Sequence, residues 1–216
     1  MRRLARLLAC VSLAALPLGA QRGPHVEIQL PTASRLTAEG PLVRARGVLS
    51  DARMRELLSS GFPARLHFRA ELWSSERWFD QLHRTAEWDV LVQWRGVDQT
   101  YEVTQFIAGR ALSLGAFVRI EDAEAAVERP LRVPIAAPAS NRRFYYEVVL
   151  DVETLSVTDL DEVSRWLRGE VLPAFRGERN AGTAITRGLR SLTTRLLGGE
   201  QRGYSARSAM FRAPRG

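Results

Sequence analysis

Apolar and polar residues alternate along several stretches of the chain, and this pattern predicts β-strands. Between residues 65 and 72, an apolar residue fills every even position and a polar or charged residue every odd one. A period of two is that of a strand with one face in a core. Similar patterns cover residues 87–94, 100–106 and 143–152. Weaker strand patterns lie near three valines, Val26, Val43 and Val133.

Short turns separate these stretches, which favours antiparallel pairing. Residues 96–99 have the composition of a hairpin turn between the second and third stretches. Seven or eight short strands joined by such turns are typical of two packed sheets or of one rolled sheet. The sequence therefore predicts a mostly β domain over residues 21–155, an antiparallel β-sandwich or open barrel with short helices.

Helical spacing is confined to four segments, of which two lie within the β-domain. Residues 50–61 have Ser50 or Asp51 in the N-cap position and Gly61 just past the last turn. Residues 121–128 predict a brief second helix that stops at a proline. Both helices are short enough to be connections between strands.

The other two helical segments lie in the C-terminal part of the chain. Residues 156–175 predict a capping helix and a linker, and residues 176–216 a basic amphipathic helix and tail. Within residues 183–197, four apolar side chains share one face, those of Ile185, Leu189, Leu192 and Leu196. We expect this C-terminal amphipathic helix to dock on the β-domain. The alternative is contact with a membrane surface or a partner protein, for which three arginines are candidates, Arg187, Arg190 and Arg195.

The first 20 residues have the pattern of a signal peptide. Arg2, Arg3 and Arg6 precede an apolar run over residues 7–18, which is shorter than the roughly 20 residues that cross a bilayer. Ala20 is a small residue suited to the position before a cleavage site. The sequence therefore predicts an exported protein, periplasmic or secreted, with no transmembrane span in the mature chain.

Charge and cysteine content narrow the possible partners. The single cysteine, Cys10, leaves with the signal peptide, so we expect no disulfide and no thiol chemistry in the mature chain. The net charge of +7 is concentrated near the C-terminus, where residues 176–216 hold nine arginines and two acids. An exported protein rarely meets nucleic acid. The expected partners are therefore an envelope protein or an anionic membrane surface.

No residue pattern points to catalysis, to a metal or to a cofactor. His25, His67 and His83 are isolated in sequence, and no nucleophile elbow, phosphate loop or dinucleotide fingerprint is present. Five acids gather between residues 71 and 89, but charges on the outer face of strands are the ordinary explanation. We therefore expect a protein that is not an enzyme, with no catalytic or metal-binding residue.

The stretch AELWSSERWFD, residues 70–80, places three large aromatic side chains near one turn. Strand alternation favours packing of these rings in the core and at its rim, as it does for Trp88. The alternative is a stacking or apolar contact surface. For that reason Trp73 and Trp78 are the candidate residues for a partner or ligand surface.

Several of these features together resemble a known family. They are a short helix ending at Gly61, the pair Phe62 and Pro63, a strand that closes on Glu71-Leu72-Trp73, and the turn Arg77-Trp78-Phe79-Asp80. Over about residues 42–153, the chain resembles the domain of unknown function 4390, a family of uncharacterised exported bacterial proteins. The resemblance implies a small exported domain and names no reaction. An arginine-rich tail replaces the tryptophan-rich C-terminus that the family often carries.

The sequence predicts an exported, non-enzymatic β-domain that binds a protein partner or a surface in the cell envelope. A carrier of an apolar small ligand or lipid in the sandwich interior is the alternative, and a hydrolase that uses surface carboxylates is the third possibility. An interior cavity of several hundred Å³ would favour the carrier, and acids that converge in a cleft would favour the hydrolase. A solid core with an exposed apolar patch or edge strand would favour the binding domain.

Overall fold

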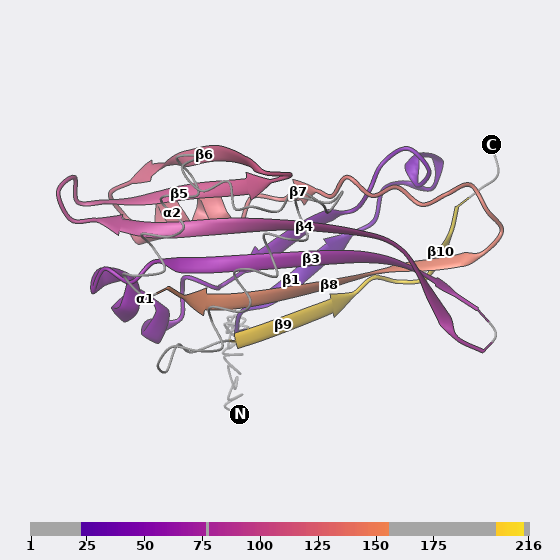
Figure 1. Ribbon diagram of the computed structural model, residues 1–216, viewed down its shortest axis with the longest axis horizontal. Coiled ribbons are helices and arrows are strands. Elements are labelled where there is room, and N and C mark those ends of the chain that lie inside the picture. Colours follow the sequence, from indigo (N-terminus) through magenta and orange to yellow (C-terminus); the bar gives the residue numbers. More distant parts are fainter. Residues whose placement is uncertain (1–22, 77, 156–201, 214–216) are drawn as a thin grey trace, which may run out of the picture.

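The computed structural model describes residues 23–76, 78–155 and 202–213 (Figure 1). Within them the chain is mostly β, as the alternation predicts. The strands are β1 (His25–Gln29), β2 (Leu42–Arg46), β3 (Ala64–Ser75), β4 (Asp80–Arg95), β5 (Thr100–Ile107), β6 (Arg110–Phe117), β7 (Leu131–Arg132), β8 (Arg143–Thr154), β9 (Arg202–Arg207) and β10 (Phe211–Arg212). The helices are α1 (Ala52–Ser59) and α2 (Ile120–Val127), with a short 3-10 turn at Ala33–Arg35.

These strands form two antiparallel sheets. The small sheet has the order β1-β2-β7, and the large sheet has the order β10-β8-β3-β4-β5-β6, with β9 also paired to β8. The long strand β8 therefore has β3 along one edge and β9 and β10 in succession along the other. The large sheet does not close into a barrel, so the two-sheet form of the predicted fold is confirmed.

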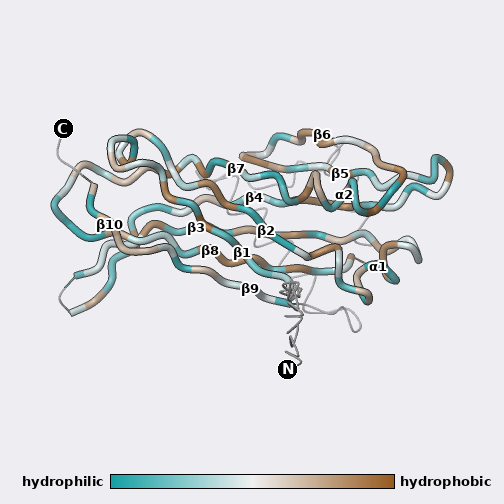
Figure 2. Tube along the Cα trace, turned by 180° about the vertical axis from the view of Figure 1, so that it is seen from behind, coloured by the Kyte–Doolittle hydropathy of each residue, from teal (hydrophilic) through white to brown (hydrophobic). Residues whose placement is uncertain are grey.

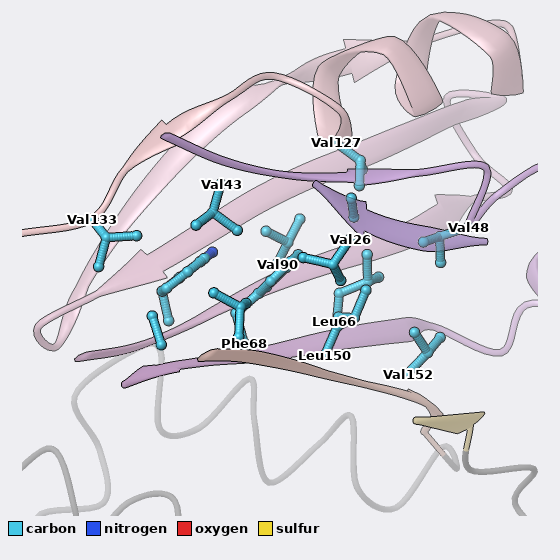
Figure 3. Packing of buried hydrophobic residues seen from close by; sticks show 14 of the residues in the cluster. Val26, Val43, Val48, Leu66, Phe68, Val90, Val127, Val133, Leu150 and Val152 are labelled. Carbon is cyan, nitrogen blue, oxygen red and sulfur yellow. The ribbon is translucent and has the colours of Figure 1, made fainter. Parts of the chain in front are cut away.

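The core lies between the two sheets. Val26 and Val43 of the small sheet face Leu66 and Leu150 of the large one (Figure 3). Trp88 is 4% exposed and stacks on Phe68, with ring centroids 4.8 Å apart and planes 7° from parallel. The burial predicted for Trp88 is confirmed.

Both helices predicted within the β-domain are present. The side chain of Asp51 accepts a hydrogen bond from the backbone N–H of Met54 at 3.0 Å, which caps α1. Gly61 follows the helix with φ of 87°, a conformation that glycine adopts without strain. The second helix, α2, packs against β5 and β6 and ends before Pro130.

The C-terminal part contributes two strands to the large sheet. Residues 202–212, inside the predicted basic tail, form β9 and β10. The predicted signal peptide, the helices over 158–169 and 183–197, and the candidate residues Arg187, Arg190 and Arg195 lie outside the described residues. Among the residues that are described, no helix is long and apolar enough to cross a membrane.

Candidate functional site

The loop end of the β3–β4 hairpin lies beside β10 in the views of both Figure 1 and Figure 2, and β3 stays paired with β8 as far as Ser75. The pairing register of β3 with β4 shifts between Leu72 and Trp73, because Leu72 pairs with Arg84 whereas Trp73 pairs with Leu82. His83 is therefore an extra residue on β4, which makes this position a β-bulge. Such bulges bend a strand and increase its twist, and they are common where a sheet must re-aim a side chain.

The bulge is held by contacts on both sides of its imidazole ring. Nε2 of His83 lies 2.8 Å from Oγ of Ser74, which is fully buried. The ring meets the buried ring of Phe144 edge-on, with centroids 5.4 Å apart. The conformation of the hairpin at this bulge is thus fixed by packed side chains.

Side chains near β8 brace the end of the hairpin. The hydroxyl of Tyr145 donates a hydrogen bond to Oδ2 of Asp80 at 2.7 Å. Burial, together with this hydrogen bond, raises the pKa of Tyr145 to about 12, so the hydroxyl remains a donor at neutral pH. Arg142 forms an ion pair with Glu76 at 3.1 Å and donates to Gln81 at 3.5 Å. The strand-connecting residues 76–79 are therefore tied to the sandwich.

The end of the hairpin exposes large apolar side chains. Trp78 is 85% exposed, Phe79 is 68% exposed and Leu82 is 43% exposed. We call these three residues the aromatic tip. The predicted core packing is therefore wrong for Trp78 and Phe79, and a contact surface is the better interpretation of their positions.

The other candidate tryptophan, Trp73, pairs with Leu82 of the aromatic tip but is far less exposed than Trp78. It lies on the outer face of the large sheet, where it is half-buried and its indole N–H donates to Oε2 of Glu71 at 3.0 Å. Its parity places it on the face opposite Leu72, as the sequence predicts for one of these two neighbours. The structure thus exposes Trp78 and half-buries Trp73.

The other end of the same hairpin carries a group of ionisable side chains that the sequence analysis missed. We call Arg65, His67, Asp89 and Glu153 the buried charge cluster. Asp89 Oδ1 accepts from Nε of Arg65 at 2.8 Å and lies 3.0 Å from Nδ1 of His67. Nη1 of Arg65 lies 3.5 Å from Oε2 of Glu153. Their side chains are between 8% and 20% exposed.

The pKa values of the two carboxylates of this cluster shift in opposite directions, although burial raises both. Burial raises the pKa of Asp89, but the hydrogen bond from His67 and the charge of Arg65 outweigh it, so that the pKa lies below its usual value. For Glu153, burial raises the pKa above its usual value, and the charge of Arg65 offsets only part of this effect. The partners of Asp89 therefore stabilise its charged form, whereas burial destabilises the charged form of Glu153.

The acids near the hairpin do not converge on one point. Glu76 pairs with Arg142, Asp80 accepts from Tyr145, and Asp89 belongs to the buried charge cluster. Across the described part of the chain, no group of three or more histidines, cysteines and acids is placed to hold a metal ion. Each of these carboxylates has its own structural partner.

The cavity found between the two sheets among the described residues is small. A cavity of about 60 Å³ lies between β2, α2 and the strands β3 to β6, with Phe68, Trp88 and Val127 in its wall. Ligand-binding pockets usually measure about 300–1,000 Å³. A more open groove of about 440 Å³ lies near the 3-10 turn, between Leu30, Arg35 and Arg132. Its Arg35 and Arg132 both contact Glu39, at 2.8 Å.

Together, these features define a two-sheet antiparallel β-domain with a packed interior and one exposed aromatic hairpin. Comparison of the chain with protein-family models, with curated proteins and with solved structures gives no match. The resemblance to the domain of unknown function 4390 stays a prediction.

Proposed function

We propose that the protein is an exported, non-enzymatic β-domain that binds a partner in the cell envelope through its aromatic tip. The observation that carries this proposal is the exposure of Trp78 and Phe79, 85% and 68%, at the end of a braced hairpin. Export rests on the basic and apolar pattern of residues 1–20. The arginines predicted as additional contacts, Arg187, Arg190 and Arg195, keep that role as a prediction.

The geometry of the hairpin supports a binding role. Large aromatic side chains in water are unfavourable, whereas tryptophan dominates the binding energy of many interfaces. The contacts of Asp80 with Tyr145 and of Glu76 with Arg142 hold the tip in place before any partner arrives. A pre-ordered contact surface loses less conformational entropy on binding than a loop that must first become ordered.

The packed interior of the sandwich also supports binding through the aromatic tip. The cavity between the sheets is about 60 Å³, which is well below the volume of an ordinary small-molecule site. Among the described residues, the most exposed aromatic side chains are those of the aromatic tip, Trp78 and Phe79.

Fractionation of cells that carry tip variants tests this function. We expect Trp78→Ser/Phe79→Ser to release the protein from the envelope fraction while its melting temperature stays unchanged. The matched control is Val97→Ser/Val118→Ser, which removes two apolar side chains of 96% and 74% exposure from other parts of the surface. Envelope association that survives in the tip variant, or is lost equally in the control, would overturn the proposal.

A further inference from the structure

We infer that the partner of the aromatic tip is an anionic lipid surface, into which Trp78 and Phe79 insert while nearby arginines contact the headgroups. This inference rests on the proposed function, since it names the partner of the same site. It follows from the charge around the tip, from the small size of the apolar patch and from the position of the tip at the end of the hairpin.

The positive charge around the tip is not neutralised. Strand pairing places Ser75, the last paired residue of β3 before the loop, next to Arg143 of β8, and Arg143 next to Arg212 of β10. Both arginines therefore lie in one row with the loop end of the hairpin. Arg84 follows the bulge on β4. All three arginines are exposed, and no carboxylate in the described part of the chain forms an ion pair with them.

The acids closest to the tip are already engaged. Glu76 is paired with Arg142 at 3.1 Å, and Asp80 accepts from Tyr145 at 2.7 Å. Glu147, further along β8, lies 3.5 Å from Arg207. Tyr145 is neutral, so Asp80 keeps its negative charge, but the three arginines outnumber it. The charge left over at this end of the molecule is therefore positive, which complements a surface of anionic headgroups.

The size of the patch favours a bilayer over a protein. Three side chains make a small apolar patch compared with a stable protein interface, which typically buries about 1,200–2,000 Å² in total. A membrane surface needs no matching pocket. Aromatic side chains reside favourably at the boundary between headgroups and acyl chains. An apolar anchor and a basic patch are each weak alone, and stable membrane association arises when the two act together.

The hairpin also presents the tip without obstruction. Trp78 and Phe79 lie in the loop between Ser75 and Asp80, at the end of the hairpin beside β10 (Figure 1), and are 85% and 68% exposed. Helix α2, in contrast, carries three acids, of which Glu121 and Glu124 pair with Arg55, so this surface has no excess of positive charge to attract anionic headgroups. The sandwich would therefore approach a membrane with the tip first.

Sedimentation with protein-free vesicles tests this inference. The purified protein is mixed with vesicles of phosphatidylcholine alone, or of phosphatidylcholine with phosphatidylglycerol, over a range of salt concentrations. We expect binding to the anionic vesicles that weakens as salt rises. Trp78→Ser/Phe79→Ser should reduce it by at least about tenfold, because the buried apolar area is lost. Arg143→Gln/Arg212→Gln should reduce it by about fivefold for each arginine and flatten the salt dependence.

Matched variants isolate the tip from the rest of the chain. Val97→Ser/Val118→Ser and Arg110→Gln/Arg129→Gln remove the same kinds of side chain from exposed positions elsewhere. Both controls should bind as the parent does. All variants share the same termini, so any contribution from the basic tail is constant.

The possible outcomes separate the two proposals. Absence of binding to the anionic vesicles, or tip variants that bind as well as the parent, would overturn the lipid inference. If the same tip variant still leaves the envelope fraction in cells, a protein partner replaces the lipid and the proposed function stands. If the tip variant stays in the envelope fraction, the proposed function fails as well.

Discussion

Folded proteins usually bury apolar side chains and expose charged ones, and the two ends of the β3–β4 hairpin both depart from this rule. At one end, the buried charge cluster keeps Arg65, His67, Asp89 and Glu153 largely out of water. At the other end, Trp78 and Phe79 are mostly exposed. Alternation along a strand therefore predicts the face on which a residue lies, but the elements that cover that face decide whether its side chain is buried.

The two ends also differ in their importance for stability. Charges removed from water are tolerated only when partners satisfy them, so loss of one partner leaves an uncompensated charge behind. An exposed aromatic side chain makes few contacts within its own fold. We therefore expect the buried charge cluster to be sensitive to mutation, and the aromatic tip to be open to change without loss of the fold.

The largest difference should appear between two tryptophans on this hairpin. We expect Trp88→Ala to reduce the free energy of unfolding by about 3–5 kcal/mol, because it removes the partner stacked on Phe68 and leaves a cavity. Trp78→Ala should change it by less than about 0.5 kcal/mol, as at an ordinary surface position. Urea denaturation of both variants measures the difference. Equal losses would show that the tip is part of the stabilising core.

A smaller loss is expected when the buried charge cluster loses its central anion. Asp89→Ala removes the acceptor for Arg65 and His67. We expect a loss of about 3 kcal/mol, at the low end of the range for a broken buried ion pair because Asp89 is 20% exposed. Asp98→Ala, in the exposed turn between β4 and β5, is the control and should lie within about 0.5 kcal/mol of the parent. A near-neutral Asp89→Ala would mean that solvent already satisfies Arg65.

The smallest effect should be a change in pH dependence caused by Glu153. Its pKa is raised in the folded protein, so the folded state binds the proton more tightly than the unfolded state, whose glutamates titrate near about 4.3. The contribution of Glu153 to stability is therefore fully present below the unfolded pKa and is lost as the pH rises through the raised folded value.

Substitution of this residue isolates that contribution. We expect the free energy of unfolding of the parent, relative to Glu153→Gln, to fall as the pH rises from about 4 to about 7. Urea denaturation of both proteins across this range measures the difference. If the free energy of unfolding of the parent, relative to Glu153→Gln, stays constant or increases with pH, then burial does not destabilise the charged form of Glu153.

The sequence predicts the parts of the fold that depend on local pattern. Alternation identifies β3, β5 and β8, cap residues identify α1, and the stop at Pro130 marks the end of α2. The turn over residues 96–99 is confirmed as the connection between β4 and β5. Strand β6 was missed, since its register shifts opposite Val103 and Thr104 and breaks the alternation there. Most of its residues are exposed, so its sequence lacks the apolar face that would predict a strand.

The position of the aromatic tip was missed for a related reason. The resemblance implies a turn over residues 77–80, and the alternation favours core packing of its rings. The strand pairing instead runs to Ser75 and Asp80 and leaves Trp78 and Phe79 exposed. Residues 80–85 are mostly exposed and carry no regular alternation, so nothing in their pattern marks them as a strand. Hydrogen bonding to β3 extends the strand beyond its apolar signal, and this extension moves Trp78 and Phe79 to the end of the hairpin.

The buried charge cluster could not be predicted from local pattern at all. His67 was correctly assigned to the polar face of its strand, but that face is largely shielded at this point. Arg65, Asp89 and Glu153 come from three different strands and meet only through the register of β3 with β4 and β8. A weak signal was present in Leu91, an apolar residue at a polar position of its strand, which is buried on this outer face.

The bulge at His83 also makes the end of the hairpin a separable module. An extra residue already interrupts the ladder between Leu72 and Trp73, and packed side chains hold that interruption in place. This bulge lies between residues 76–79 and Trp88, so we expect an insertion or deletion in that loop to leave the register at Trp88 unchanged. The sequence of the aromatic tip can therefore change, by natural variation or by grafting of another loop, while the strand register of the sandwich stays the same.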